Sequence, residues 1–261
     1  MTKLTVLVVG ANGSIGRLAV AECLRRGHRT RALVRDTSRG ASLPADAEIV
    51  VGDLTSAATL ADAVDGVDGV DGVVFTHGSY GGAAEAERVD YGGVRNVLEA
   101  LGGRRARIAL MTAIGVTKHT PGHDWKRRGE RLVRASGLPY TIVRPGWFDY
   151  NRPDQQRLVM LQGDRRWASD PSDGVVSRAQ IAQVLVASLT SQAADHKSLE
   201  LVADHGPAQT DLDPLFQGLQ PDPAGALDAV LDRENMPLDQ EPRAVIADLE
   251  SAQRRTRRPA R

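Results

Sequence analysis

Three glycines near the start of the chain follow an apolar run and precede a helical pattern. The run Val6–Val9 leads into Gly10, Gly13 and Gly16, spaced G-x-x-G-x-x-G. Between a strand and a helix, this spacing is typical of a turn that binds the pyrophosphate of a dinucleotide. Glycine permits the tight turn, the approach of backbone to phosphate and the close packing of the helix, whose N-terminus offers unpaired N–H groups. The predicted loop comprises Gly10, Ala11, Asn12, Gly13, Ser14, Ile15 and Gly16.

A basic residue ends the next predicted strand, Thr30–Arg35. At this position a carboxylate binds the ribose 2′-hydroxyl of NAD, whereas an arginine accommodates the 2′-phosphate of NADP. Arg35 therefore favours NADP over NAD, because a guanidinium can hold a phosphate with two parallel hydrogen bonds. Asp36 keeps NAD open as the alternative, since a shift of one residue exchanges the two assignments. The third interpretation is that Arg35 binds no ligand and is simply a solvated surface charge.

Polar residues also follow the third predicted strand, Ala47–Val51. Asp53 can accept a hydrogen bond from the exocyclic amine of an adenine, and Leu54 can pack on its ring. A carboxylate in this place can equally cap the short helix that follows, close to Thr55. The sequence leaves both interpretations open.

The fourth and fifth predicted strands, Gly72–Thr76 and Arg107–Thr112, end in small and polar residues. Here a glycine lets backbone run close to a cofactor, and a hydroxyl can touch substrate or the nicotinamide ribose. His77 titrates near neutrality and can act as an acid or base, or is simply a polar loop residue. The cofactor-binding residues predicted at these two ends are Thr76, His77, Gly78, Thr112 and Ala113.

Strands alternate with helices throughout the first part of the chain. The further expected elements are the strands 140–143, 158–161 and 198–202 and the helices 14–26, 57–64, 83–101, 124–135, 181–189, 212–218 and 244–252. This alternation predicts an α/β, doubly wound parallel sheet with ligands beyond the carboxyl ends of its strands, and a small irregular C-terminal substrate region. We expect a nucleotide-binding domain over 1–205 and a partly helical extension over 206–261, with a frayed basic end.

Lys126 lies in the helical pattern Asp124–Ala135, at the border of its apolar stripe. Gly129 in mid-helix lowers helix propensity, and close approach of another helix would explain its presence. The neighbouring Arg127 and Arg128 predict an exposed basic side for this helix. A solvated Lys126 is the alternative to a functional one.

Composition narrows the classes of partner. The 33 basic and 33 acidic residues cancel, so no overall charge draws the chain to nucleic acid or to a membrane. No apolar stretch is long enough to span a bilayer, so we expect a cytoplasmic protein. We expect its partner to be a small-molecule substrate. The lone Cys23 and scattered histidines lack metal-ligand spacing, so we expect no metal.

The motifs together resemble one known family, the atypical short-chain dehydrogenases/reductases, and within it the NAD(P)-binding, NmrA-like branch. The resemblance covers residues 4–203, and its most specific parts are the glycine loop and the segment Ser136–Gly146. It implies a Rossmann domain that binds NADP as a monomer or homodimer, with these residues beside the nicotinamide: Pro145, Gly146, Trp147 and Phe148. Tyr150 and Asn151 would then line the substrate side.

One position departs from the family pattern. The family's catalytic pair is Tyr-x-x-x-Lys, and with Lys126 as the lysine the tyrosine position holds Gly122. The candidates left for catalysis are Lys126, which can also hold the nicotinamide ribose, Thr112 and His123. Spacing does not choose between His123 and its neighbours His119 and Asp124 as a substitute proton donor.

Three functions remain open at this point. The first is an oxidoreductase that transfers a hydride from NADPH to a small carbonyl, quinone or flavin-like acceptor. The second is a redox sensor that binds NADP without turnover, which the missing tyrosine favours. The third, a sugar-nucleotide epimerase or dehydratase, fits least, because that chemistry usually needs the tyrosine and a larger substrate domain.

Overall fold

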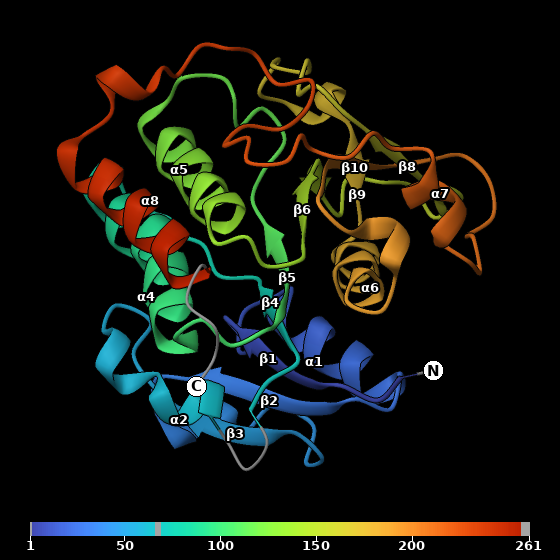
Figure 1. The fold of residues 1–261 in the computed structure, drawn as a ribbon. Helices are drawn as coiled ribbons and strands as arrows, with labels where there is room; N and C mark the ends of the chain where they lie inside the picture. The colour runs from blue at the N-terminus through green and yellow to red at the C-terminus, as the bar shows by residue number, and fades with distance from the viewer. Residues whose placement is uncertain (1, 66–68, 257–261) are drawn as a thin grey trace.

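Six parallel strands form the centre of the fold in the order β3-β2-β1-β4-β5-β6. This is the arrangement of a doubly wound sheet, in which the chain starts in the middle and winds outward in both directions. The computed structural model, shown in Figure 1, describes residues 2–65 and 69–256. The six strands are β1 Thr5–Val9, β2 Arg29–Val34, β3 Glu48–Val51, β4 Gly72–Phe75, β5 Arg107–Met111 and β6 Tyr140–Pro145. The α/β doubly wound fold expected from the alternating pattern is confirmed.

Two further strands extend the sheet beyond β6. Strand β10 (Lys197–Asp204) runs parallel to β6, and β8 (Arg157–Leu161) pairs with β10 in the antiparallel direction. A separate two-stranded parallel sheet joins β7 (Trp147–Phe148) to β9 (Val175–Val176). Sequence patterns predicted β8 and β10 but not this small sheet, because two-residue strands carry no periodicity.

Helices cover both faces of the sheet, as Figure 1 shows. On one face α1 (Gly16–Arg25), α6 (Arg178–Ser188) and α7 (Asp213–Gln217) pack on one apolar cluster. On the other face α4 (Gly92–Leu101), α5 (Pro121–Ala135) and α8 (Arg243–Thr256) pack on a second cluster. The shorter segments are α2 Ala61–Asp65, α3 Ala83–Ala86 and the 3₁₀ turns η1 Thr37–Gly40, η2 Ala57–Thr59, η4 Pro171–Asp173, η5 Gln192–Ala194 and η6 Leu238–Gln240.

The helix predicted over 83–101 is interrupted. Between α3 and α4 the residues Glu87–Tyr91 form a π-helical turn, η3. This turn buries Asp90 and Tyr91, whereas Val89 is only half-buried. π-helical turns occur frequently at functional sites. Gly129 of α5 packs against this region, since a Cβ at Gly129 would lie 3.4 Å from the carbonyl oxygen of Asp90.

Helix α5 differs from its prediction in two respects. It begins at Pro121 and not at Asp124, because the Thr120 hydroxyl caps it by accepting a hydrogen bond from the His123 N–H at 3.2 Å. Its predicted exposed basic side is wrong for Arg127, which is 1% exposed. The segment 222–241, called here the C-terminal strap, covers this side of the helix.

Carboxylates of the strap bind the arginines of α5. Asp228 pairs with Arg127 at 3.0 Å and with Arg131 at 2.6 Å, both between guanidinium nitrogen and carboxylate oxygen. Glu241 pairs with Arg131 at 2.8 Å and with Arg128 at 2.6 Å. Spacing within α5 cannot reveal partners about 100 residues away in the sequence, so this network could not be predicted.

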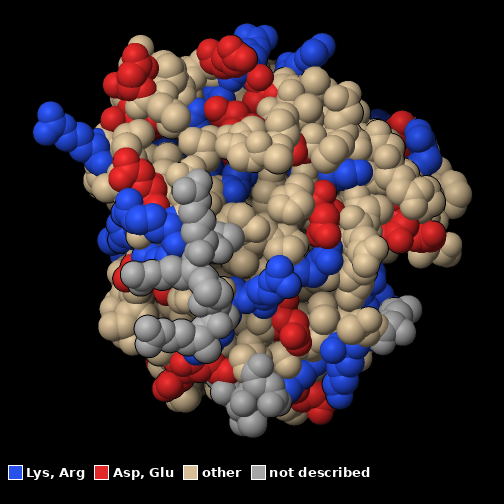
Figure 2. All heavy atoms as spheres, in the orientation of Figure 1, with Lys and Arg blue, Asp and Glu red and all other residues tan. Residues whose placement is uncertain are grey.

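The face shown in Figure 2 carries lysine and arginine side chains interspersed with aspartate and glutamate. Among the described residues no helix is long and apolar enough to cross a membrane. Of the basic end predicted to be frayed, residues 257–261 lie outside the part of the chain that the structure describes.

Candidate functional site

The glycine loop joins β1 to α1 at the carboxyl edge of the sheet. Gly10 has φ +81°, and a Cβ there would lie 2.8 Å from the backbone nitrogen of His77. A Cβ at Gly16 would lie 2.0 Å from the carbonyl oxygen of Gly10. A tight turn at Gly10 and close helix packing at Gly16 thus agree with the roles predicted from the spacing.

Backbone donors of this loop remain available for a ligand. The Gly13 N–H closes the turn by donating to the Gly10 carbonyl at 2.9 Å. Within the described residues, the N–H groups of Asn12, Ser14 and Ile15 donate to no protein acceptor. These three N–H groups lie at the N-terminus of α1, where the helix dipole favours negative charge. The loop therefore fits the pyrophosphate of a dinucleotide.

At the end of β2, Arg35 and Asp36 have different surroundings, although the sequence left open which of them faces the cofactor. Asp36 caps the η1 turn, because its carboxylate accepts hydrogen bonds from the Ser38 hydroxyl and from Arg39. Arg35 is exposed and makes no hydrogen bond or ion pair with the rest of the described chain, although its charge helps to lower the pKa of Asp53. Arg35, and not Asp36, is the free group at this strand end.

Asp53 forms a local turn after β3. One carboxylate oxygen, Oδ1, accepts from the Thr55 N–H at 2.9 Å and from the Thr55 hydroxyl at 2.8 Å. These two hydrogen bonds hold the pKa of Asp53 below its usual value. Asp53 therefore makes a local turn with Thr55 and does not cap the next helical turn, η2, which begins at Ala57 after Ser56. Leu54 packs over Gly93, where a Cβ would lie 2.7 Å from its Cδ2.

Thr76 and His77 follow β4 beside the glycine loop. The Thr76 hydroxyl donates to the Val9 carbonyl at 2.9 Å, which fixes the ends of β4 and β1 together. Burial lowers the pKa of His77 to about 4. Its predicted titration near neutrality is thus wrong, because the ring packs against Phe75 at 5.6 Å and loses the solvation that stabilises its charged form. Gly78 follows, exposed, at the same edge.

Lys126 is held at this edge by an aspartate that sequence reasoning missed. The Lys126 Nζ lies 2.8 Å from Oδ2 of Asp90, which stands in the π-helical turn η3 and is 6% exposed. Asp90 also accepts from the Ser79 N–H at 2.9 Å and from its hydroxyl at 2.7 Å. Lys126 is therefore an anchored cation and not a freely solvated one.

Thr112 points into the protein at the end of β5. Its hydroxyl donates to Oε1 of Glu130 at 2.7 Å, and Thr112 is 7% exposed. Its proton is thus committed to a buried carboxylate. The next residue, Ala113, is half-buried at the same edge. His77, Asp90, Thr112 and Lys126 line one small cavity of about 10 Å³, roughly the room of a single water molecule.

His123 lies in the first turn of α5. Its Nδ1 is buried without a hydrogen-bond partner in the described part of the chain. A Cβ at Gly115 would lie 3.9 Å both from His123 Cε1 and from Trp167 Cδ1. The structure thus puts His123 next to the loop that follows β5.

The segment after β6 lies beside the β5 loop. The Ile114 N–H donates to the carbonyl of Pro145 at 3.1 Å. A Cβ at Gly146 would lie 2.4 Å from the carbonyl oxygen of Gly174, so only glycine fits there. Trp147 is 36% exposed and meets Tyr150 edge to face at 6.0 Å, whereas Phe148 packs on the core. Trp147 and Tyr150 therefore offer an aromatic surface near the strand ends.

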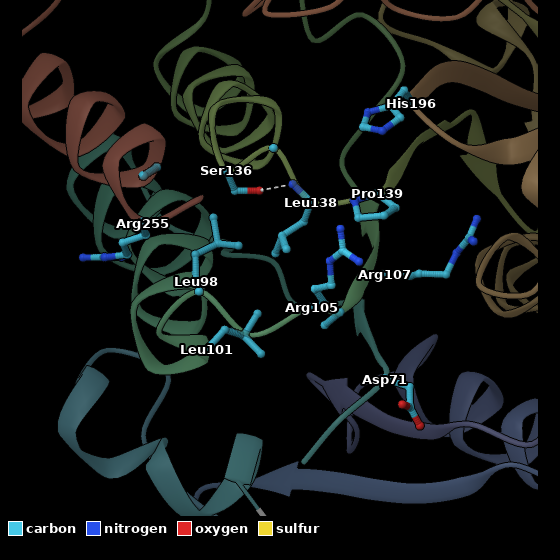
Figure 3. A pocket seen from close by; sticks show the side chains of 14 residues that line it. Asp71, Leu98, Leu101, Arg105, Arg107, Ser136, Leu138, Pro139, His196 and Arg255 are labelled. Atoms are coloured by element: carbon cyan, nitrogen blue, oxygen red, sulfur yellow. Dashed lines mark hydrogen bonds between the residues drawn. The ribbon is translucent and has the colours of Figure 1, made fainter. Parts of the chain in front are cut away.

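A large cavity, of about 740 Å³, lies at the other end of the sheet. Figure 3 shows its lining, in which Asp71 precedes β4, Arg107 begins β5 and Pro139 precedes β6. These are amino ends of strands, and the ends of α4 and α5 that border the cavity are C-terminal. Helix C-termini carry negative partial charge and do not favour phosphate. This cavity is thus distinct from the glycine-loop edge.

Two further residues of the edge were not found from the sequence. Glu130, 0% exposed, links Thr112 to the Arg144 guanidinium at 2.6 Å. Arg178 begins α6 and donates from Nε to the Ser14 hydroxyl at 3.1 Å. The predicted helix 181–189 begins three residues earlier in the structure, after the capping box of Ser177 and Gln180, and the sequence did not indicate that its first residue meets the glycine loop. Among the described residues, no cluster of three or more His, Cys, Asp or Glu side chains is placed to hold a metal ion.

Comparison with known proteins agrees with this geometry. A family model described as NAD(P)H-binding matches residues 10–192. The chain is 31% identical over 83% of its length to divinyl chlorophyllide a 8-vinyl-reductase of Zea mays, and it spans 58% of that protein. It is 26% identical over 76% of its length to sanguinarine reductase of Eschscholzia californica, covering 89% of that protein.

A solved structure shares the fold. The NAD-dependent epimerase/dehydratase-like protein from Bacillus halodurans superimposes with a TM-score of 0.66 over 83% of this chain and 100% of that one, at 24% identity. The family model matches residues 10–192, which contain β2 to β9, so these comparisons show the family. Two of the relatives are reductases by name. The chain belongs to the NAD(P)H-binding family whose model it matches, and its Rossmann fold is consistent with the expected atypical short-chain dehydrogenases/reductases.

Proposed function

We propose that this protein is an NADPH-dependent reductase that transfers a hydride to a small carbonyl, quinone or flavin-like acceptor. The observation that carries the proposal is the Lys126 ammonium group anchored to Asp90 at 2.8 Å, beside the strand ends that border the glycine loop. A fixed cation here is suited to hold ribose hydroxyls and to donate a proton. The reductases of maize and Eschscholzia californica among its relatives support the same reaction class.

The reaction joins one hydride and one proton to the acceptor. NADPH, when bound, supplies the hydride. The loop N–H groups hold the phosphates, and Lys126 can bind the nicotinamide ribose while its ammonium delivers the proton. Asp90 keeps the Lys126 ammonium group in one place through the 2.8 Å contact. The exposed pair of Trp147 and Tyr150 offers a surface on which a flat acceptor can stack.

NADP is the preferred cofactor in this proposal. Arg35 is free at the end of β2, whereas the Asp36 carboxylate is already engaged by Ser38 and Arg39. A 2′-phosphate would give Arg35 an anionic partner, and the 2′-hydroxyl of NAD would find no free carboxylate.

One observation favours a second function, an NADP-binding redox sensor without turnover. Gly122 occupies the tyrosine position of the family pair, and a Cβ there would meet no described atom within 4 Å. The proton donor of the usual reaction is thus absent from its usual position, while the groups suited to cofactor binding remain.

Titration and turnover assays together separate the two functions. We expect NADPH to bind in calorimetric titration and to be oxidised with at least one of a panel of quinones, flavins and aldehydes. Lys126→Met should then lower turnover by roughly 10²-fold or more, in the range of a lost general acid. Binding without oxidation against the whole panel would support the sensor. No NADPH binding would overturn both functions.

Lys118→Met is the matched control. Lys118 is also tied to the protein, through the Trp167 carbonyl at 2.9 Å, but it lies in the loop after β5 and does not contact Asp90. We expect it to change turnover much less than Lys126→Met. Equal losses in both variants would argue against a specific role for Lys126.

A further inference from the structure

Arg178 connects the glycine loop with the segment after β6. It is the first residue of α6, whose start is fixed by the capping box of Ser177 and Gln180. Helix α6 packs alongside α1, and this brings Arg178 to the N-terminal end of α1. There its Nε donates to the Ser14 hydroxyl at 3.1 Å. The N–H groups left open by the loop thus have a guanidinium beside them.

The surroundings of Arg178 hold its guanidinium in place. The Asp149 carboxylate accepts from the Arg178 backbone N–H at 2.9 Å and pairs with its Nη1. The Phe148 ring lies 5.3 Å from the guanidinium carbon, in the geometry of a cation–π contact. Asp149 adopts a left-handed backbone with φ 60°, a conformation that costs energy in a residue other than glycine. The Ser14 hydroxyl, the Asp149 carboxylate and the Phe148 ring therefore position one side chain.

Part of this guanidinium remains available for a ligand. Its side chain is 34% exposed. An arginine has five N–H donors, and within the described residues Nη2 donates to no protein acceptor. With Nε and Nη1 engaged by Ser14 and Asp149, the available Nη2 lies beside an open helix N-terminus. A charged donor in this place is suited to an oxyanion, because a hydrogen bond from a guanidinium to phosphate is charge-assisted.

We propose that Arg178 binds the pyrophosphate of the dinucleotide and closes the phosphate site from the side opposite the loop backbone. This inference rests on cofactor binding by the proposed function and goes beyond it, because the glycine motif alone gives only backbone donors. It also makes Arg178 common to NADP and NAD, since both carry the pyrophosphate. Arg35, in contrast, would serve the 2′-phosphate alone. Arg178 therefore sets affinity, and Arg35 sets the choice between the two cofactors.

The test compares ligands that share only part of the dinucleotide. NADPH, NADH and ADP-ribose are each titrated calorimetrically into wild type and Arg178→Gln. We expect the dissociation constant to rise about 10- to 100-fold for all three, the range for loss of a charge-assisted hydrogen bond. Adenosine, which has no phosphate, should bind both proteins equally. Arg178→Lys, which keeps the charge without the fork, should lose less affinity than Arg178→Gln.

The matched control is Arg157→Gln. Arg157 also pairs with an aspartate, Asp204, at 2.6 Å and its side chain is 47% exposed, but it lies on β8. We expect this control to leave all three dissociation constants unchanged. Thermal unfolding of each variant separates lost binding from lost folding, and Arg178→Lys tests the charge in case Arg178→Gln is less stable.

Two outcomes would overturn the inference, and they are distinguishable. If wild type binds all three phosphate ligands and both Arg178 variants bind them within twofold of wild type, Arg178 has no part in phosphate binding while the proposed function stands. If wild type binds none of the three, the proposed function fails and the inference fails with it. A loss confined to NADPH would assign Arg178 to the 2′-phosphate and contradict the pyrophosphate assignment.

Discussion

Arginines are used in opposite ways at the strand-end edge and under the C-terminal strap. Under the strap, Arg127, Arg131 and Arg144 are each at most 1% exposed and every one is paired with carboxylates. At the edge, Arg35 is exposed, and Arg178 keeps donors that no described group accepts. A buried guanidinium must be paired, because desolvation of a bare charge is costly. Free arginines beside open backbone donors are instead suited to a ligand.

Arginines thus have two roles in this molecule: those under the strap stabilise the fold, and those at the edge are suited to bind a ligand. Composition counts all arginines alike, and the expected exposed basic side of α5 came from treating Arg127 as solvated. Its partners Asp228 and Asn235 come from the strap, at 3.0 Å for the carboxylate. The strap thus uses the basic face of α5 for packing. If this contrast is right, substitutions under the strap should affect stability, and substitutions at the edge should affect binding.

The largest effect is expected for Arg144→Ala. Arg144 binds Glu130 and Asp232 at 2.6 and 2.7 Å, so its removal leaves the buried Asp232 without its cation and Glu130 with Arg134 as its only ion-pair partner among the described residues. Breaking a buried ion pair from one side costs about 3–5 kcal/mol. Urea denaturation should show this loss of unfolding free energy.

The exposed pair of Arg254 and Glu250 gives the control for Arg144. Arg254 is 67% exposed at its side chain, and Arg254→Ala should change the unfolding free energy by less than about 0.5 kcal/mol. Equal effects of the two substitutions would contradict the assignment of the strap network to stability.

Glu200 is a buried carboxylate close to Arg144, and it tests the role of the buried charges further. It is 4% exposed, its Oε1 has no hydrogen-bond partner among the described residues, and Arg144 lies 3.8 Å away. Burial raises the pKa of Glu200 to about 7, although Arg144 opposes the rise. Between the ordinary pKa of 4.5 and about 7, the folded protein keeps a proton that the unfolded chain has lost. Stability attributable to Glu200 therefore falls as pH rises through this window.

Glu200→Gln should remove this pH dependence. The shift corresponds to about 3 kcal/mol in full, so the variant should be more stable than wild type at pH 8 by up to that amount. At pH 4 both carboxyl and amide are neutral, and the two proteins should differ little. Urea denaturation at both pH values measures the difference. A variant less stable than wild type at pH 8 would show that the ionised carboxylate is favourable in its site.

The sequence predicted the fold far better than the partners within it. Alternating apolar strands and helices sufficed for the parallel sheet, because each signal is local. The glycine loop was also local, and its spacing agrees with the contacts of Gly10 and Gly16. Asp90, Glu130 and Arg178 were missed because their roles depend on which element lies beside them. His77 was misjudged for the same reason, since burial lowers its pKa and no residue nearby in the sequence indicates that burial.

The edge is tested next by Arg35→Ala. Loss of a guanidinium from a 2′-phosphate should raise the dissociation constant of NADPH about 10- to 100-fold and leave that of NADH nearly unchanged. Thermal unfolding should be close to wild type, because Arg35 has no partner in the described chain to lose. Calorimetric titration of both cofactors gives the ratio. Equal weakening for NADPH and NADH would contradict the NADP preference.

A small effect on stability is expected for Gly122→Tyr, which restores the family pair with Lys126. A Cβ at Gly122 has no described atom within 4 Å, and replacing a helical glycine adds helix propensity. Unfolding free energy should thus change by about 1 kcal/mol or less. Turnover is the informative measurement, because residues four apart on a helix share a face and would put the phenol near Lys126. A rise in NADPH oxidation would show that the edge is a complete reductase site lacking only an efficient proton donor. No rise would mean that Lys126, held by Asp90, already supplies the proton or that the site serves binding alone, and the Lys126→Met variant decides between these two.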